Sequence, residues 1–273
     1  MPGPVTSVEI SDVRGHVTIG DNNVVVSGDR SYVQVVQAGQ RPVPVAREDR
    51  TLLPRRPRAA VGRERELGDL VRGLTEHGLC QVHGPSGIGK STLLRLAAHL
   101  LAGTDRPVVF VDAAGREAGD VLQDVFEACY DAPGYRPSPV ELRRLMAAVE
   151  LDVVLDDLEG EAAELDTVLD VLPSSALLCA SGRRTLLGKG RALALGGLGH
   201  EEALTLLSQG LGRPLATSEE PVAEELWRAT SGAPLPLLRA AATDRLRPAA
   251  ELDGLLPRLL TALAGAERDV VEI

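Results

Sequence analysis

The chain has 273 residues and a net charge of −10, enough for one large domain or for one domain with appendages. Aromatic residues make up only 2% of it, so a core must be built from Leu, Val and Ala. Residues 1–60 hold eight Arg and six acidic residues, a balance of +2, which leaves −12 for residues 61–273. An acidic body with few aromatics lacks the basic stripe and the stacking surface of a nucleic-acid reader, so we expect no nucleic-acid partner.

The cysteines and the apolar segments indicate a soluble protein of the cytoplasm. Cys80, Cys129 and Cys179 fall in expected buried strands or helices without metal-ligand spacing, which is typical of packing residues in a reducing compartment. The first four residues do not begin a signal peptide, and no apolar run reaches membrane-spanning length. We therefore expect no membrane span.

Residues 1–40 differ in composition from the rest of the chain. Residues 17–26 are rich in β-branched side chains, glycines punctuate them, and residues 33–36 add a further short strand. Three such strands cannot bury a core alone. Residues 41–60 combine Pro with Arg, and we interpret them as a solvated linker, although five of the Arg side chains could also contact phosphates: Arg47, Arg50, Arg55, Arg56 and Arg58.

From residue 61 the pattern alternates between apolar strands and amphipathic helices, which favours a parallel sheet with crossover helices. We expect strands at 79–82, 107–111, 151–155, 176–180 and 192–195, and helices at 64–77, 90–102, 119–130, 139–149 and 161–171. From residue 201 the pattern is wholly helical, with helices expected at 201–210, 219–230, 234–247 and 255–264.

The most specific motif lies between the first expected strand and the second expected helix. It fits G-x-x-x-x-G-K-[ST] and consists of Gly84, Pro85, Ser86, Gly87, Ile88, Gly89, Lys90 and Ser91, followed by Thr92. Glycines let the backbone wrap around an anion, and the helix that follows presents its positive end. Lys90, one of only two lysines in the chain, is predicted to reach the β- and γ-phosphates, and the Ser91 hydroxyl to ligand Mg²⁺. The motif predicts a phosphate loop (P-loop) that binds a nucleotide.

Paired acids follow the apolar strand expected at 151–155. We predict that Asp156 holds Mg²⁺, directly or through water, and that Asp157 orients or deprotonates the attacking water. Paired acids are also common at a plain helix N-terminus, but a P-loop upstream in the same sheet favours the catalytic interpretation.

Further motifs resemble those of STAND-class signal-transduction ATPases, the NB-ARC and NACHT relatives, and they occur in that family's order over residues 61–240. Residues 61–67 are similar to the signature whose backbone lies against adenine, which implies nucleotide-binding roles for Val61, Gly62 and Arg63. Residues 179–184 resemble the sensor strand that ends in an Arg near the γ-phosphate. We assign that role to Arg183, with Arg184 as the alternative.

The same resemblance extends into the helical part of the chain. Residues 198–204 fit the family's step from the sheet into its lid, and residues 231–237 resemble the lid element whose proline, here Pro234, packs on adenine. The implied fold class is α/β: a P-loop NTPase parallel sheet with a C-terminal helical lid and a short β-rich N-terminal segment. The implied domains are an ATPase domain at 61–198, a lid at 199–257 and the start of a winged-helix region at 258–273.

Residues 17–23 resemble the core of RIP-homotypic-interaction (RHIM-like) amyloid signalling motifs, a β-branched triplet followed by Gly and an Asn-rich turn. Such a motif implies an effector protein with a matching N-terminal segment. Alternating Val and Ile can form dry zippers, and stacked Asn can form ladders. A small β-hairpin array and a disordered tail are the alternatives.

These features predict an ATP/ADP-dependent, Mg²⁺-requiring signalling switch with slow ATPase activity. It would form a homo-oligomer and act on an effector through its N-terminal β segment, in bacterial defence or programmed cell death. One alternative is the NTPase module of a STAND transcriptional regulator, for which we find no helix-turn-helix. Another is a metabolic ATPase or kinase, for which we find no acceptor-substrate pocket.

Overall fold

The computed structural model describes residues 9–10, 33–34, 43–58, 60–158, 162–186 and 188–243. The chain divides into two compact units: residues 1–45 with 131–136, and residues 46–130 with 137–273. In the first unit, strands β1 (Glu9–Ile10) and β2 (Val33–Gln34) pair in antiparallel fashion. The strands expected within residues 17–26 lie outside the described residues. Two short strands, β3 (Val45–Ala46) and β6 (Tyr130–Asp131), each have one residue in the first unit and one in the second.

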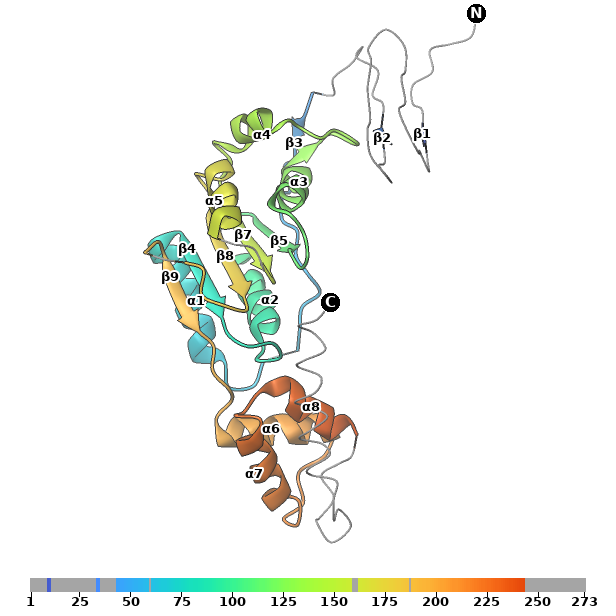
Figure 1. Ribbon diagram of the computed structural model, residues 1–273, viewed down its shortest axis with the longest axis vertical. Helices are drawn as coiled ribbons and strands as arrows, with labels where there is room; N and C mark the ends of the chain where they lie inside the picture. The colour runs from blue at the N-terminus through green and yellow to red at the C-terminus, as the bar shows by residue number, and fades with distance from the viewer. Residues whose placement is uncertain are drawn as a thin grey trace, which may run out of the picture. The chain divides into compact units, whose positions relative to one another are not determined.

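A parallel five-stranded sheet forms the centre of the second unit (Figure 1). Its strands are β4 (Leu79–His83), β5 (Val108–Asp112), β7 (Asp152–Asp156), β8 (Ala176–Ser181) and β9 (Arg191–Ala194). Their order is β5-β7-β8-β4-β9, so β8 lies between the strand before the P-loop and the strand before the paired acids. The predicted parallel sheet is confirmed, with each strand within one residue of its expected bounds.

The helices between these strands are α1 (Glu64–His77), α2 (Lys90–Leu101), α3 (Ala118–Cys129), α4 (Pro139–Met146) and α5 (Ala162–Val171). Local sequence fixes several of their ends. Gly78 closes α1 in the left-handed conformation, and Ser138 and Glu141 form a capping box at the start of α4. The structure ends α4 three residues before the expected residue 149, where a turn from Val149 to Met146 redirects the chain towards β7.

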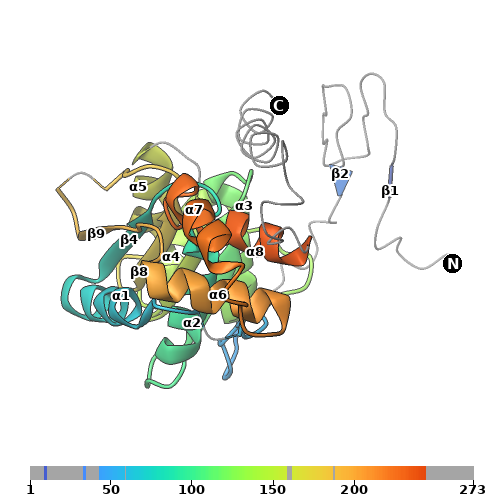
Figure 2. The same cartoon turned by 90° about the horizontal axis from the view of Figure 1, so that it is seen from below.

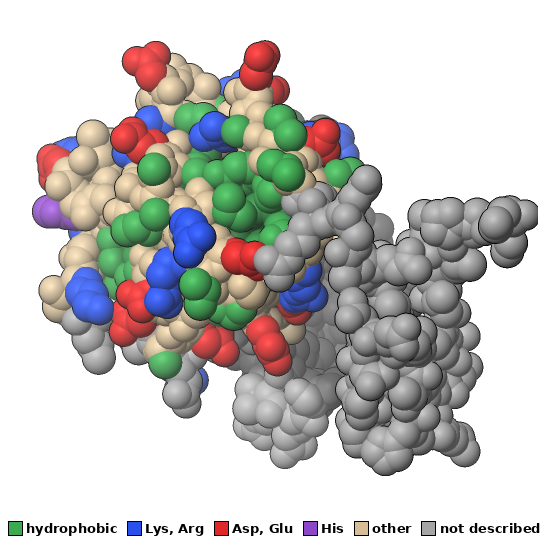
Figure 3. Space-filling view, turned by 90° about the horizontal axis from the view of Figure 1, so that it is seen from above, with side chains coloured by type: hydrophobic (Ala, Val, Ile, Leu, Met, Phe, Trp, Pro, Cys, Tyr) green, Lys and Arg blue, Asp and Glu red, His purple; other side chains and the backbone are tan. Residues whose placement is uncertain are grey.

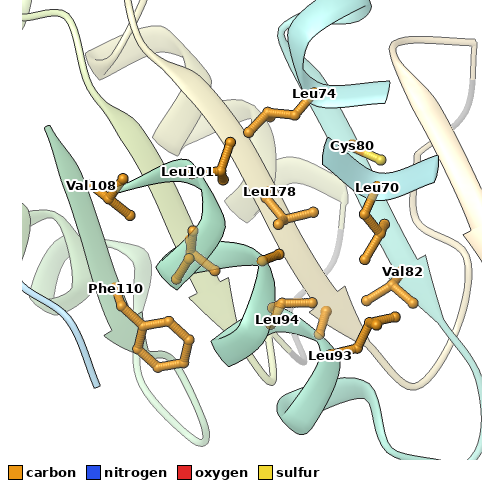
Figure 4. Close-up of a cluster of buried hydrophobic side chains, with 14 of the residues drawn as sticks. Leu70, Leu74, Cys80, Val82, Leu93, Leu94, Leu101, Val108, Phe110 and Leu178 are labelled. Carbon is orange, nitrogen blue, oxygen red and sulfur yellow. The ribbon is translucent and has the colours of Figure 1, made fainter. Parts of the chain in front are cut away.

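Helices α1 and α2 cover one face of the sheet, and α3 and α5 cover the other (Figure 2). Figure 4 shows how the first face is filled: Leu70 and Leu74 of α1 and Leu93, Leu94 and Leu101 of α2 meet the side chains of four strands. Phe110 is the single aromatic side chain in this cluster. The core is therefore built almost entirely from aliphatic side chains, as the composition predicts.

One residue of the Pro/Arg-rich segment that we interpreted as a linker pairs alongside the edge strand β5. Leu52 forms a parallel bridge with Val109, with hydrogen bonds from Leu52 N to Val108 O of 2.8 Å and from Phe110 N to Leu52 O of 2.9 Å. Pro54 O lies 3.0 Å from a ring nitrogen of His99 on α2. Residues 52–54 thus pack on the sheet domain and do not act only as a solvated linker.

Helices α6 (His200–Leu211), α7 (Glu220–Ala229) and α8 (Pro234–Ala242) follow the sheet and have a core of their own, centred on Leu207, Ala223 and Leu237. Helix α8 ends at Ala242, before the expected residue 247. The helix expected at 255–264 and the winged-helix region lie outside the described residues. None of the helices in the described part of the chain has both the length and the apolar character of a membrane span.

All three cysteines are buried free thiols. Burial raises the pKa of Cys80 and Cys129 to about 11 and that of Cys179 to about 12.

On the end of the second unit away from α6–α8, hydrophobic side chains lie among charged ones (Figure 3).

Candidate functional site

The predicted P-loop joins the carboxyl end of β4 to the start of α2. Gly87 and Gly89 have φ angles of 76° and 101°, which L side chains rarely adopt. A Cβ on Gly87 would also come within 3.0 Å of the Leu235 Cβ. Glycine is therefore required here both by the turn and by the close approach of α8.

Lys90 is the first residue of α2, and its ammonium group lies against the P-loop. The Nζ atom donates hydrogen bonds to Gly84 O at 2.8 Å and to Pro85 O at 3.1 Å, and the residue is only 9% exposed. An ammonium group has no fixed hydrogen-bonding plane, so it can turn from carbonyl oxygens to phosphate oxygens with little movement.

Asp156, at the end of β7, is 4% exposed, and its Oδ1 atom has no hydrogen-bond partner among the described residues. Burial raises the pKa of this carboxyl, while a hydrogen bond with Ser91 and the charge of Arg95 oppose that rise. A buried carboxylate oxygen without a partner is costly, and here it lies beside a hydroxyl group. Carboxylate and hydroxyl oxygens are ligands that Mg²⁺ prefers, so Ser91 and Asp156 fit the predicted metal site.

No cluster of three or more His, Cys, Asp or Glu side chains in the described residues is placed to hold a metal ion.

Asp157 is half-buried and has a φ angle of 58°, one of two positive values among the non-glycine residues that the structure describes. Such a conformation costs free energy and is found preferentially at functional sites. The next residue returns to the sheet, since Leu158 N donates to Ala180 O at 2.8 Å. The chain therefore turns sharply at Asp157, beside β8.

The loop after β8 carries Arg183 and Arg184, both exposed. Arg184 Nε donates to Leu186 O at 3.2 Å. The pKa of His83, at the end of β4, is lowered first by the burial of its ring and second by the charge of Arg184. Among the described residues the Arg183 side chain makes no hydrogen bond. The structure thus brings Arg184 near His83, which immediately precedes the P-loop, and within the described part of the chain the Arg183 guanidinium has no hydrogen-bond partner.

Sequence reasoning missed a residue that holds this loop. Gln81 in β4 is fully buried, and its side chain bonds to Ser181, Thr185 and Leu186. The available signal was a lone amide inside an apolar strand.

A cavity of about 450 Å³ lies between the P-loop and the lid helices. Five of its lining residues were predicted to bind nucleotide: Val61, Arg63, Gly89, Thr92 and Pro234. The others are Pro57, Arg58, Ala60, Leu198, Leu206, Gln209, Gly210 and Leu238. Gly62 does not line it, because this glycine lies against α6, where a Cβ would overlap the Glu202 side chain.

Arg63 connects three parts of this site. Its guanidinium donates to Glu66 Oε1 at 2.8 Å, to Ile88 O in the P-loop at 3.2 Å and to Gly196 O before the lid at 2.7 Å. The residue is 5% exposed. Its side chain therefore links α1, the P-loop and the connection to α6.

The lid also contacts the P-loop directly. Leu235 N, in the first turn of α8, donates to Gly87 O at 3.2 Å, and Pro234 lies beside Gly89. The entry to the lid is fixed by hydrogen bonds from Leu198 N to Gly232 O at 2.8 Å and from Trp227 Nε1 to Leu198 O at 2.9 Å.

No protein-family model matches the chain, and no curated protein does. Among solved structures, the Walker-type ATPase PABY2304 of Pyrococcus abyssi aligns over 82% of this chain and 78% of its own, with a TM-score of 0.56 and 16% identity. The fold is that of a P-loop NTPase.

Weaker likenesses include DnaA from Aquifex aeolicus bound to AMPPCP, with a TM-score of 0.44 and 16% identity over 78% of this chain and 68% of that one. Domain III of the Thermotoga maritima replication initiation protein DnaA gives a TM-score of 0.44 and 15% identity over 72% of this chain and 87% of that one.

Proposed function

We propose that this chain is a nucleotide-dependent switch that binds ATP and ADP with Mg²⁺ between its sheet and its helical lid. The observation that carries the proposal is the hydrogen bond from Leu235 N of α8 to Gly87 O of the P-loop. Because of that hydrogen bond, the position of the lid is coupled to the conformation of the phosphate-binding backbone. A change of the nucleotide bound at the P-loop is therefore expected to shift α8.

Each part of the site has a role in this proposal. The base and ribose occupy the cavity lined by Val61 and Pro234, and the phosphates lie on the P-loop, where Lys90 exchanges its carbonyl bonds for phosphate oxygens. Ser91 and Asp156 hold Mg²⁺, which when bound neutralises charge on the β- and γ-phosphates.

Hydrolysis, in this proposal, is slow because a switch must remain in its ATP state. Asp157 orients the attacking water or takes its proton, and Arg183 stabilises charge on the γ-phosphate. The γ-phosphate makes contacts that ADP cannot make, and this differential affinity shifts the population between two lid positions.

The signalling steps rest on the sequence motifs of the chain. ATP-bound copies assemble into a homo-oligomer in the cytoplasm and bring segments 1–40 together at high local concentration, which promotes their cross-β stacking. An effector with a matching motif then joins by strand addition, in bacterial defence or programmed cell death. The NTPase module of a STAND transcriptional regulator is a second candidate, because the resemblance to the STAND class covers the ATPase and lid alone.

Lysine substitutions test the nucleotide site. We expect Lys90→Ala to abolish ATP and ADP binding in titration calorimetry without altering the circular dichroism spectrum. Lys189→Ala is the matched control, because it removes the only other lysine, an exposed partner of Asp166 at 2.9 Å. Equal affinity in Lys90→Ala and wild type would overturn the nucleotide site.

Amide exchange tests the switch. The protection of the Leu235 amide is expected to differ between the ADP-bound and ATP-bound protein, because its acceptor belongs to the P-loop. Identical protection in the two states would contradict a lid that responds to the γ-phosphate.

A further inference from the structure

Gln81 is a fully buried amide in the middle of β4, the strand that delivers the P-loop. Its neighbours in sequence, Cys80 and Val82, point into the aliphatic cluster shown in Figure 4. Since side chains alternate along a strand, Gln81 points to the opposite face. Burying an amide in a strand costs free energy unless each of its polar atoms is hydrogen-bonded. The hydrogen-bond partners of Gln81 therefore show what this side chain holds in place.

Those partners lie at the last residue of β8 and in the loop that follows it, about one hundred residues further along the chain. Gln81 Nε2 donates to Ser181 Oγ and Thr185 Oγ1, both at 2.7 Å, and Oε1 accepts from the backbone N–H groups of Thr185 and Leu186, both at 3.1 Å. Ser181 Oγ in turn donates to Arg183 O at 2.6 Å.

These bonds fix the orientation of the amide. The Oε1 atom faces two backbone donors, and a flipped amide would point its NH₂ group at them and lose both bonds. One side chain therefore sets the backbone on both sides of Arg183 and Arg184, while both arginines remain exposed at the carboxyl edge of the sheet.

We propose that Gln81 is a positioning residue that fixes the arginine loop (residues 181–186) relative to the P-loop and thereby sets the preference of the site for ATP over ADP. The proposal rests on the proposed nucleotide switch. Gln81 itself touches no nucleotide. Because Gln81 belongs to β4 and bonds to the last residue of β8 and to the loop after it, its side chain ties that loop to the strand that leads into the P-loop.

The distinguishing feature of this role is its selectivity for one phosphate. The P-loop backbone and the lid cavity would contact ATP and ADP alike, and Lys90 would reach the β-phosphate of both, whereas an arginine in the 181–186 loop would contact the γ-phosphate alone. Displacing the loop is therefore expected to weaken ATP binding and to leave ADP binding nearly unchanged. A general loss of stability would weaken both.

Three variants of the full chain test the role. Gln81→Leu keeps the approximate volume and removes all the bonds to the loop. Thr185→Val removes one hydroxyl partner at a half-buried position and guards against misfolding of the first variant. Val82→Ala, in the adjacent core position, is the matched control that lowers stability without touching the loop.

Dissociation constants are measured by calorimetry with Mg²⁺ for ADP and for adenylyl imidodiphosphate, a non-hydrolysable ATP analogue. For Gln81→Leu the ratio of the ADP constant to the analogue constant is expected to fall about tenfold or more, the effect of one lost hydrogen bond to a charged group. Thr185→Val moves the ratio in the same direction by less, and Val82→Ala leaves it unchanged. The Leu186 amide exchanges faster in Gln81→Leu, and Val82→Ala does not have this effect.

One outcome overturns the role of Gln81 alone: an unchanged ratio in both Gln81→Leu and Thr185→Val, whether the two affinities stay the same or weaken equally. Wild-type protein that binds neither nucleotide would overturn the proposed function as well. The two failures are therefore distinguishable in one set of titrations.

Discussion

Replacing Asp156 by Asn should make the nucleotide-free protein more stable. Asp156 is 4% exposed, and one of its carboxylate oxygens has no hydrogen-bond partner among the residues that the structure describes, so burial of its charge lowers the stability of the folded protein. Asn keeps the shape and can keep the bond with Ser91, but it carries no charge. An unsatisfied charged group costs more than an unsatisfied neutral one, and we expect a gain of about 1 kcal/mol, or a rise in Tm of about 2–4 °C for a domain of this size.

The sign of the pH dependence follows from the pKa of Asp156. Burial raises this pKa in the folded protein above its ordinary value of 3.8. Below the ordinary pKa both the folded and the unfolded chain are protonated, so the group costs nothing there. As pH rises above the ordinary pKa the unfolded chain loses its proton while the folded chain keeps it, so the cost grows until the folded pKa is passed, and above that pKa it is fully present. The advantage of Asp156→Asn should therefore be present at pH 7 and shrink as pH falls towards 4.

Urea denaturation at the two pH values, with and without Mg²⁺ and ATP, measures these effects. Asp105→Asn is the matched control, since Asp105 is exposed, and it should change stability by less than about 0.5 kcal/mol. Saturating ligand stabilises a protein by about 2.7 kcal/mol at one hundred times its Kd. Wild type should gain this stabilisation in full and Asp156→Asn only in part, which reverses their order. A nucleotide-free Asp156→Asn protein less stable than wild type at pH 7 would refute the reasoning.

Three further predictions concern hydrolysis, the arginine link and the N-terminal segment. Asp157→Asn should bind ATP normally and lose turnover, and wild-type turnover measured by phosphate release should stay well below the ~10 s⁻¹ typical of metabolic enzymes; a rate at that level would favour an ordinary enzyme. Arg63→Ala should lower the free energy of unfolding by about 2–3 kcal/mol, because it removes the hydrogen-bond donor of the buried Ile88 carbonyl and of the part-buried Gly196 carbonyl, whereas Arg65→Ala, at an exposed position, should change it by less than about 0.5 kcal/mol. A peptide of residues 8–37 should form fibres with a ~4.7 Å diffraction spacing, and Ile19→Asp should prevent them; a peptide that stays monomeric would remove the amyloid hypothesis.

The arrangement of the sheet domain was largely readable from local patterns. Apolar runs of strand length, such as Leu79–Val82, bounded by glycine and polar residues, identify buried parallel strands whatever they contact. The P-loop is a contiguous motif, so its backbone requirements at Gly87 and Gly89 are written in neighbouring residues. The end of α4 was misplaced because Val149 is apolar and continues the helical period, although the chain has already turned there.

Features that depend on distant residues were not readable in this way. Gln81 shows only as an amide in an apolar strand, and its partners lie about one hundred residues away, where nothing local points back to β4. The contact of Leu235 with Gly87 likewise depends on how three lid helices pack. The residues around Leu52 have the composition of a linker. Its pairing with Val109 depends on an open sheet edge that the sequence does not reveal.

The buried state of the three thiols makes the native chain suitable for site-specific labelling. A thiol whose pKa is raised to about 11 or 12 is almost entirely protonated at neutral pH and reacts slowly with maleimides, and here each sulfur is also shielded. Glu225 on α7 and Arg144 on α4 are exposed, so Glu225→Cys and Arg144→Cys would each provide one reactive thiol without removal of Cys80, Cys129 or Cys179. A pair of fluorophores attached there could follow the distance between lid and sheet in solution as nucleotide is exchanged.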